Sequence, residues 1–502
     1  MAGSGSGGPG ESSGRGTDNL GSIARTAATS GAAMVPELLA WTTSFEHDRS
    51  LVREDLLGSA AHVTMLGRQG ILAKDDATKL RAALLAMDEA ARAGTLALPE
   101  GEEDVHMAIE SKLTTDLGEL GKRLHAARSR NDQVALALRL HVRDQASKTI
   151  GELADLVQEL VAWARRDADV ILPAYTHRQR AQPISAAFLI AAWCRQLLRA
   201  TETLGHARAR ANESPLGCGA CSGTSLPIDR DVVVDLLQFD GMTANALDTI
   251  GDRDFEIDYT YAGARVLLAT SRLATDVVDF TTSEFGFLKI GDAIAAGSSM
   301  MPQKKNPDVF ELVRGKTGRG LGNLTAMLAL VKGLPAGYAR DLQDDRVPVL
   351  DTGPLVRGAV RAVRAAHVHL TFDREACLRG VADGSTQATD VAEALVRKGM
   401  PFREAYMLTG RLVQSARERG VTLASFTIAD AQAVDARFDE AVLAVLDPKR
   451  AVEAKRSKGG TAPERVEEQL SAIELAAGEF AERAHEHPSF DALRTRIQQS
   501  PI

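Results

Sequence analysis

The amino-acid sequence predicts an all-α protein with a central bundle of long helices. Only 4% of the residues are aromatic, whereas alanine and leucine are frequent, and both residues favour helices. The alternation of apolar and polar residues that is typical of strands is nearly absent. Instead, apolar residues recur at spacings of three and four over unusually long stretches, which is the pattern of an extended helical bundle.

Composition and periodicity divide the 502-residue chain into four regions. Residues 1–34 are rich in glycine, serine, alanine and threonine, and we predict a disordered tail there. Residues 35–130 are expected to form an N-terminal helical domain, because 51–91 has helical periodicity. Residues 131–380 hold the longest periodic stretches and are assigned to the central bundle, and 381–502 to a small C-terminal helical domain.

Three stretches predict the long helices of the bundle, at about 132–168, 257–280 and 310–331. If the first is unbroken, it is roughly 55 Å long at 1.5 Å per residue. Apolar helix faces of this length usually pack against other subunits as well as against their own chain. We therefore expect an oligomer.

Charge, hydropathy and cysteine content exclude several classes of function. The formal net charge of -8 argues against a nucleic-acid-binding protein. We find no run of 18 apolar residues that predicts a membrane span and no secretory signal, so a cytoplasmic location is expected. Cys218 and Cys221 form a CxxC pair, but no second pair or histidine follows at zinc spacing. The sequence therefore predicts no metal site.

Polar residues that the helical pattern does not require gather in four segments. The first, HAARSRNDQV, precedes the longest helix, where Asn131 and its neighbouring arginines suit a carboxylate; a capped helix start with solvated charges is the alternative. The second, LPAYTHRQRAQP, holds Thr176 and His177 on a turn between two prolines. Histidine is suited to proton transfer near neutral pH, although a loop histidine often has no catalytic role.

The third segment, GSSMMPQKKNPD, combines glycine and hydroxyls, then two methionines, then basic and amide side chains. We predict a mobile loop that carries the hydroxyls of Ser298 and Ser299, while Lys304 and Asn306 donate hydrogen bonds to an anion. Glu311 falls within one turn of the helix that follows. The fourth segment, GYARDLQDDR, contains Tyr338, Gln343 and Arg346. For both segments, a solvated loop is the alternative.

Together these segments resemble the fumarase/aspartase superfamily, whose signature loop reads GSSxMPxKxNP. The stretches QKKNPD, RSRNDQV, YTHxQRAQP and GGTAPERV resemble the argininosuccinate lyase family in particular, and the likeness runs from about Ser44 to Phe480. The resemblance implies a three-domain, all-α subunit in a homotetramer. It also implies that each active site combines the 125–133, 174–183 and 297–308 regions of three subunits.

The reaction that this resemblance implies is the reversible elimination of argininosuccinate to arginine and fumarate, without metal or cofactor. By resemblance, Ser298 abstracts the Cβ proton, His177 protonates the departing nitrogen, and Glu311 pairs with His177. The opposite roles for Ser298 and His177 stay open, because serine is a poor base unless its alkoxide is stabilised. The doubly charged intermediate needs preorganised donors. The substrate contacts expected are Ser44, Asn131, Thr176, Lys304, Asn306, Tyr338, Gln343 and Arg346.

Three positions depart from the family pattern. Arg178 stands where leucine is usual, Ala339 where asparagine is usual, and Arg346 where lysine is usual; arginine and lysine differ in hydrogen-bond geometry. One alternative is therefore a related carbon–nitrogen lyase acting on another N-substituted aspartate, of the ethylenediamine-disuccinate type. The other is an inactive structural protein on the same scaffold, which the presence of His177 and Ser298 disfavours.

Overall fold

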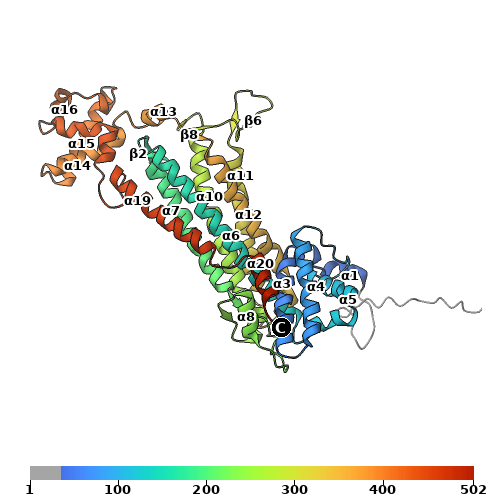
Figure 1. Cartoon of the computed structure of the whole chain (residues 1–502). Helices are drawn as coiled ribbons and strands as arrows, with labels where there is room; N and C mark the ends of the chain where they lie inside the picture. The colour runs from blue at the N-terminus through green and yellow to red at the C-terminus, as the bar shows by residue number, and fades with distance from the viewer. Residues whose placement is uncertain (1–34) are drawn as a thin grey trace, which may run out of the picture.

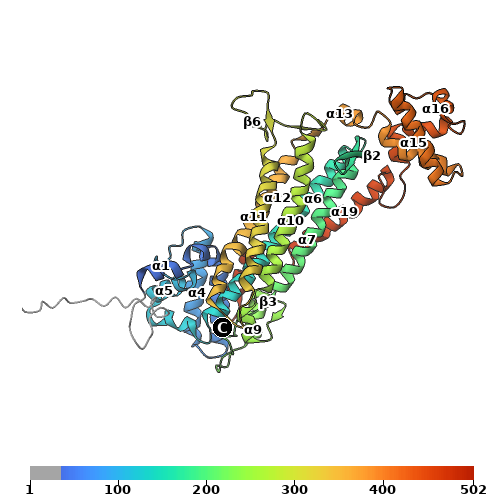
Figure 2. The same ribbon diagram turned by 180° about the vertical axis from the view of Figure 1, so that it is seen from behind.

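The computed structural model describes residues 35–502, so the predicted tail of residues 1–34 lies outside the described residues. Five long helices run side by side along the molecule (Figures 1 and 2). Their lengths confirm the prediction of an all-α protein. They are α6 (Arg130–Arg166), α7 (Ala186–Ala211), α10 (Asp254–Phe280), α11 (Asp308–Val331) and α12 (Arg346–His367).

The N-terminal helices pack beside one end of this bundle (Figure 1). They form a second apolar core, separate from that of the bundle, to which Leu57, Leu80 and Ile109 contribute. The helices are α1 (Pro36–Thr42), α2 (Phe45–Asp48), α3 (Val52–Arg68), α4 (Lys74–Arg92) and α5 (Val105–Leu117). Two elements distant in sequence, α8 (Arg230–Leu237) and α20 (Phe490–Gln499), join the same core.

A third apolar core lies beyond the opposite end of the bundle and involves buried residues between Val391 and Leu446. Its helices are α14 (Ala388–Arg397), α15 (Phe402–Glu418), α16 (Ile428–Val434) and α17 (Glu440–Leu443), followed by α18 (Pro448–Glu453). Two further short helices, α9 (Ala246–Gly251) and α13 (Arg374–Arg379), lie in connections.

The region predicted as a C-terminal domain, residues 381–502, contributes to all three apolar cores. Helix α19 (Pro463–Ala484) lies along α6 and α7, and its Leu470 and Ile473 belong to the core of the bundle. Helix α20 packs with the N-terminal helices. Helical periodicity shows that a helix has a buried face but not which element covers it. The packing of α19 on the bundle and of α20 on the N-terminal helices could therefore not be predicted from the sequence. The domain boundaries themselves stay a prediction.

The strands of the described residues are short and form four two-stranded sheets. The sheets are β1 (Ile171–Thr176) with β2 (Gln179–Ser185), β3 (Glu213–Ser214) with β4 (Gly241–Met242), β5 (Leu288–Ile290) with β8 (Leu370–Phe372), and β6 (Ala296–Gly297) with β7 (Lys305–Asn306). All are antiparallel except β3–β4. Across the same part of the chain, no helix has both the length and the apolar character needed to span a membrane.

Candidate active site

The predicted site residues fall into two groups at opposite ends of the bundle. The hairpin β1–β2 and the loop between β6 and β7 lie at one end, and the N-terminal helices at the other (Figures 1 and 2). The 24 residues of α11, which connect the two ends, span roughly 36 Å at 1.5 Å per residue. The hairpin end carries Thr176, His177, Ser298, Lys304, Asn306 and Glu311; the other end carries Ser44, Asn131, Tyr338, Gln343 and Arg346.

His177 occupies the tight turn of the β1–β2 hairpin. Its φ is 54° and that of Arg178 is 58°, so both residues adopt the left-handed conformation of a type I′ turn. The guanidinium of Arg178 is ion-paired with Asp279 at 2.5 Å, and Tyr175 packs edge-on against Phe285, with ring centroids 5.3 Å apart. These contacts offset the cost of the turn and present an exposed imidazole at its tip.

Ser298 begins the loop that β6 and β7 close. Its Oγ accepts hydrogen bonds from the backbone N–H of Met301 at 3.1 Å and of Met300 at 3.3 Å. Met300 is 88% exposed and Met301 45% exposed, so the apolar middle of the loop is not packed down in this chain. The serine hydroxyl therefore lies among backbone donors, on a loop whose apolar middle is exposed.

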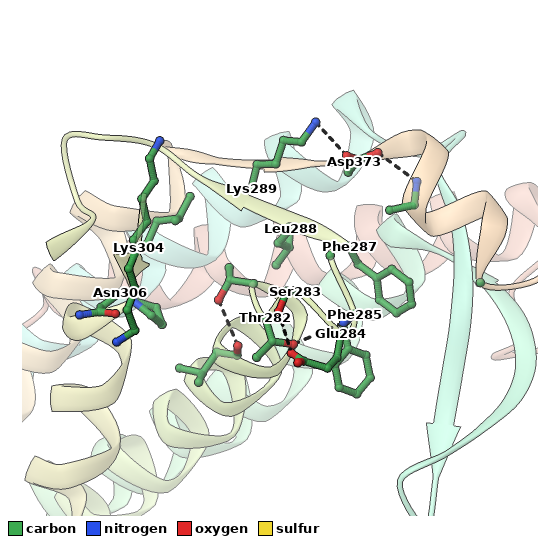
Figure 3. A pocket seen from close by; sticks show the side chains of 18 of the residues that line it. Thr282, Ser283, Glu284, Phe285, Phe287, Leu288, Lys289, Lys304, Asn306 and Asp373 are labelled. Atoms are coloured by element: carbon green, nitrogen blue, oxygen red, sulfur yellow. Dashed lines mark hydrogen bonds and ion pairs between the residues drawn. The ribbon is translucent and has the colours of Figure 1, made fainter. Parts of the chain in front are cut away.

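A cavity of about 1210 Å³ lies between this loop, the end of α10 and β5. In Figure 3, Lys304 and Asn306 lie on one side, and the segment from Thr282 to Leu288 on the other. Lys289, which also lines the cavity, is ion-paired with Asp373 at 2.8 Å. The lining includes five basic side chains (Arg180, Lys289, Lys304, Lys305, Arg379) and three acidic ones (Glu284, Glu311, Asp373). Lys305 is also ion-paired, with Asp292. Lys304 is the basic side chain of this lining that we expect to meet an anionic ligand.

The expected pair of His177 and Glu311 is not formed within one chain. Glu311 lines the cavity and is exposed, whereas His177 is not among the lining residues. Over residues 35–502, we find no hydrogen bond or ion pair between the two side chains. The pairing therefore stays a prediction for an assembled protein.

At the other end, the first turn of α6 is built around Ser129 and Asp132, which form a capping box. The Oδ2 atom of Asp132 also accepts the backbone N–H of Gly217 at 3.1 Å and of Gly219 at 2.8 Å. Burial raises the pKa of Asp132. These bonds bring the 215–224 loop across the helix start, where Asn131 Nδ2 donates to the carbonyl of Ala220 at 3.0 Å.

This loop is a part of the site that sequence reasoning missed. Its repeated glycines were the available signal, since Gly217 and Gly219 both have positive φ. The two arginines that were expected to bind a carboxylate of the ligand instead contact side chains of the protein. Arg128 is buried and donates to Ser59 at 2.8 Å, and Arg130 is paired with Asp104 at 3.2 Å.

Tyr338, Gln343 and Arg346 surround the start of α12. Burial raises the pKa of Tyr338, and Gln343 Nε2 donates to the carbonyl of Thr42 at 2.9 Å. Arg346 is only 3% exposed and is ion-paired with Asp48 at 3.0 Å. Its guanidinium also pairs with Asp345, so protein carboxylates hold it in this chain, and the substrate contact expected of Arg346 stays a prediction.

The part of the chain that the structure describes has no group of three or more histidine, cysteine or acidic side chains arranged to hold a metal ion. Cys218 is buried and Cys221 is exposed, and both are free thiols.

The family follows from comparison with known proteins. A model of the family described as Lyase matches residues 34–322, and one described as Argininosuccinate lyase C-terminal matches residues 385–453. The chain is 41% identical over 437 residues to the argininosuccinate lyase of Rippkaea orientalis, a match that covers 87% of this chain and 95% of that one. The chain belongs to the argininosuccinate lyase family. The argininosuccinate lyase of Citrifermentans bemidjiense is 40% identical over 431 residues, covering 86% and 94% of the two chains.

Two solved structures of other enzymes share the fold. An EDDS lyase in complex with formate superimposes with a TM-score of 0.80 at 26% identity, covering 90% of each chain. A class II fumarase from Schistosoma mansoni gives a TM-score of 0.68 at 15% identity, covering 80% of this chain and 90% of the fumarase, and supports the fold alone. The predicted superfamily and family are confirmed, and the chain is a carbon–nitrogen lyase.

Proposed function

We propose that this enzyme cleaves argininosuccinate reversibly to arginine and fumarate in arginine biosynthesis, in the cytoplasm. The observation that carries the proposal is the 41% identity with an argininosuccinate lyase over 95% of the length of that relative. The predicted residues Ser298, His177 and Lys304 are all present on exposed or half-buried loops, as an active site requires.

We assign the proton abstraction at Cβ to Ser298. A serine can act as a base only if its alkoxide is stabilised, and the N–H groups of Met300 and Met301 point at its Oγ. Lys304, on the same loop, and Asn306, in β7, bind the carboxylate whose charge grows in the transition state. The loss of one such donor typically costs ~10²–10³ in rate.

His177 then protonates the guanidino nitrogen as the carbon–nitrogen bond breaks. Its position at an exposed tip allows the imidazole to enter a site on a neighbouring subunit. There Glu311, exposed on α11, is available to hold the imidazole charged. General acid catalysis of this kind contributes typically ~10²–10⁴ in rate.

The active site is completed only in a homotetramer, because the two groups of site residues lie at opposite ends of one chain. The outer face of α11 supports such an assembly: Leu321 is 40% exposed and Leu328 51%, and their spacing of seven residues puts them on one side of the helix. Leu268 of the adjacent α10 is 42% exposed. Apolar side chains exposed along one face of packed helices are typical of a subunit interface.

The alternative substrate is another N-substituted aspartate, and the structural likeness to an EDDS lyase favours keeping it. The test mixes purified protein with argininosuccinate or with ethylenediamine disuccinate and follows fumarate by its ultraviolet absorbance. We expect release from argininosuccinate and none from the second compound. Release from ethylenediamine disuccinate alone would overturn the proposed substrate but leave the reaction class intact.

A further inference from the structure

The turn of the β1–β2 hairpin places two consecutive residues other than glycine in the left-handed region. The strands pair Thr176 with Gln179, so the turn consists of His177 and Arg178, whose φ angles are 54° and 58°. Glycine, asparagine and aspartate adopt this conformation readily, whereas histidine and arginine do so at a cost. Backbone strain of this kind persists only where the surrounding structure holds it. The contacts that hold this turn therefore affect the position of His177.

Two contacts join the hairpin to the end of α10. The ring of Tyr175 packs against Phe280, the last residue of α10, and against Phe285, with ring centroids 6.2 and 5.3 Å apart. At the turn itself, Nη2 of Arg178 donates to Oδ2 of Asp279 at 2.5 Å. The side chain of His177 is exposed, so its position depends on the backbone of the turn, which the pair of Arg178 and Asp279 holds from one side.

Asp279 stands where a carboxylate does not favour its own helix. It lies in the last turn of α10, in which no basic residue occurs, and the C-terminal end of a helix carries a negative partial charge. Asp276, three residues earlier, adds a second carboxylate, which accepts from Nε1 of Trp193 at 2.7 Å. Arg178 therefore supplies the positive charge that the last turn of α10 lacks, and this attraction holds the hairpin turn on the helix.

We propose that Arg178 and Asp279 are positioning residues that hold the imidazole of His177 in the orientation needed for proton transfer. The inference rests on the proposed function and deepens it. His177 lies at the tip of the hairpin, so a small change in the turn displaces its imidazole. A misplacement of about 1 Å can cost ~10²-fold in rate. Leucine, the usual residue of the family at position 178, has no charge to pair with Asp279, so this contact depends on the arginine of this chain.

The exposure of the pair decides where its effect appears. The side chain of Arg178 is 74% exposed and that of Asp279 28%, and exposed ion pairs contribute little to the free energy of unfolding. We therefore expect the melting temperature to change little when the pair is broken. The rate of the step that needs His177 should fall instead, because the pair selects one orientation of the turn within the folded state.

The first test measures argininosuccinate cleavage in a single turnover, a rate that excludes product release. Asp279→Asn keeps the shape of the side chain and removes its charge, and we expect this rate to fall about tenfold and the steady-state KM to stay within about twofold. The matched control, Asp258→Asn, breaks the exposed pair that Asp258 forms with Arg210 at 2.7 Å on the same helix and should keep the wild-type rate. Equal rates in the two variants would overturn the proposal.

Arg178→Gly separates positioning from support of the turn alone. Glycine adopts a φ of 58° without strain, so the melting temperature should stay the same or rise. The rate should nevertheless fall about tenfold, because the guanidinium that reaches Asp279 is lost. A glycine variant as fast as the wild type would show that only the backbone conformation matters at this position, which contradicts the proposal.

The exchanged pair Arg178→Asp/Asp279→Arg tests the contact itself. Aspartate tolerates the left-handed conformation, and an arginine near the C-terminal end of α10 suits the helix dipole, so the reversed pair is able to form. Each single variant should lose about tenfold in rate, and the double variant should recover to within about threefold of the wild type. A double variant no faster than the slower single variant would show that the pairing is not what matters.

Amide hydrogen exchange tests the same pair without substrate. In Asp279→Asn, deuterium uptake by the peptide covering residues 171–185 should rise, because the hairpin opens more often, while Asp258→Asn should match the wild type. Unchanged uptake in Asp279→Asn would overturn the proposal whatever its rate. Wild-type protein that releases no fumarate from argininosuccinate would instead contradict the proposed function, and the exchange measurement would still decide whether the pair holds the turn.

Discussion

The carboxylate of Asp132 holds the backbone of Gly219, whose N–H lies 2.8 Å from Oδ2. Through this bond, a loop joins the first turn of α6, and the carbonyl of Ala220 then accepts the amide of Asn131, 89 positions earlier in the chain. A predicted substrate residue is thus oriented by a segment that carries no catalytic side chain.

Gly219→Ala is expected to lower both stability and substrate affinity. Gly219 has a φ of +58°, and a Cβ there would lie 2.8 Å from the carbonyl oxygen of Gly223. The left-handed conformation alone costs an alanine roughly 1–2 kcal/mol, so the melting temperature should fall and KM rise. Gly205→Ala, in open space on α7, is the control and should be neutral or slightly stabilising. Equal melting temperatures for the two variants would contradict the role of Gly219.

His177→Asn is expected to lower kcat strongly while keeping the fold. Asparagine tolerates the left-handed conformation that φ of 54° requires, so the turn should persist and only the imidazole is lost. We expect kcat to fall by ~10²–10⁴ with an unchanged melting temperature. His177→Ala should lose the same activity and also melt lower. Activity in His177→Asn close to that of the wild type would exclude His177 as the acid.

His62 is expected to make stability depend on pH. Burial and the charge of Arg128 lower its pKa to about 3 from an ordinary 6.5, so the folded protein binds this proton less readily than the unfolded chain. The stability that neutral His62 contributes is fully present above pH 6.5, and it is lost as the pH falls from 6.5 towards 3. At pH 5 the loss is about 2 kcal/mol.

The pH effect is measured as the change in melting temperature between pH 8 and pH 5. His62→Gln removes the titrating group, and its melting temperature should fall less over this range than that of the wild type. His206→Gln, at an exposed position of α7, serves as the control and should follow the wild type. A His62→Gln protein with the same pH dependence as the control would show that His62 is not the group responsible.

Leu321→Arg/Leu328→Arg is expected to dissociate the proposed tetramer, because two charges would be buried on the outer face of α11. The mass from light scattering should fall, and activity with it. Met407→Arg, at a residue that is 63% exposed on α15, should change neither. An active double variant of unchanged mass would place the interface elsewhere.

Mixed subunits test whether each site draws on several chains. Asn131→Ala and Ser298→Ala affect opposite ends of the bundle, and each should be inactive alone. After joint unfolding and refolding, some sites of the hybrids contain neither defect, so activity should return in part. A mixture of Ser298→Ala and Lys304→Ala, both in the same loop, should stay inactive. Recovery in both mixtures, or in neither, would argue against shared sites.

Much of the fold could be predicted because each long helix has its own apolar stripe. The predicted stretches 257–280 and 310–331 correspond to helices Asp254–Phe280 and Asp308–Val331. What could not be predicted is which core each helix joins. Leu470 of α19 and Leu493 of α20 follow the same periodicity, yet they pack into different cores.

The sequence by itself determined the fold class, the family and the residue types of the site, because periodicity and short motifs are local properties of the chain. Only the tertiary structure decided how those residues are used. It placed His177 and Asn131 at opposite ends of one subunit, enclosed Arg346 between Asp48 and Asp345, and brought the 215–224 loop onto α6. Such relationships depend on burial and on contacts between distant segments, which no local pattern contains.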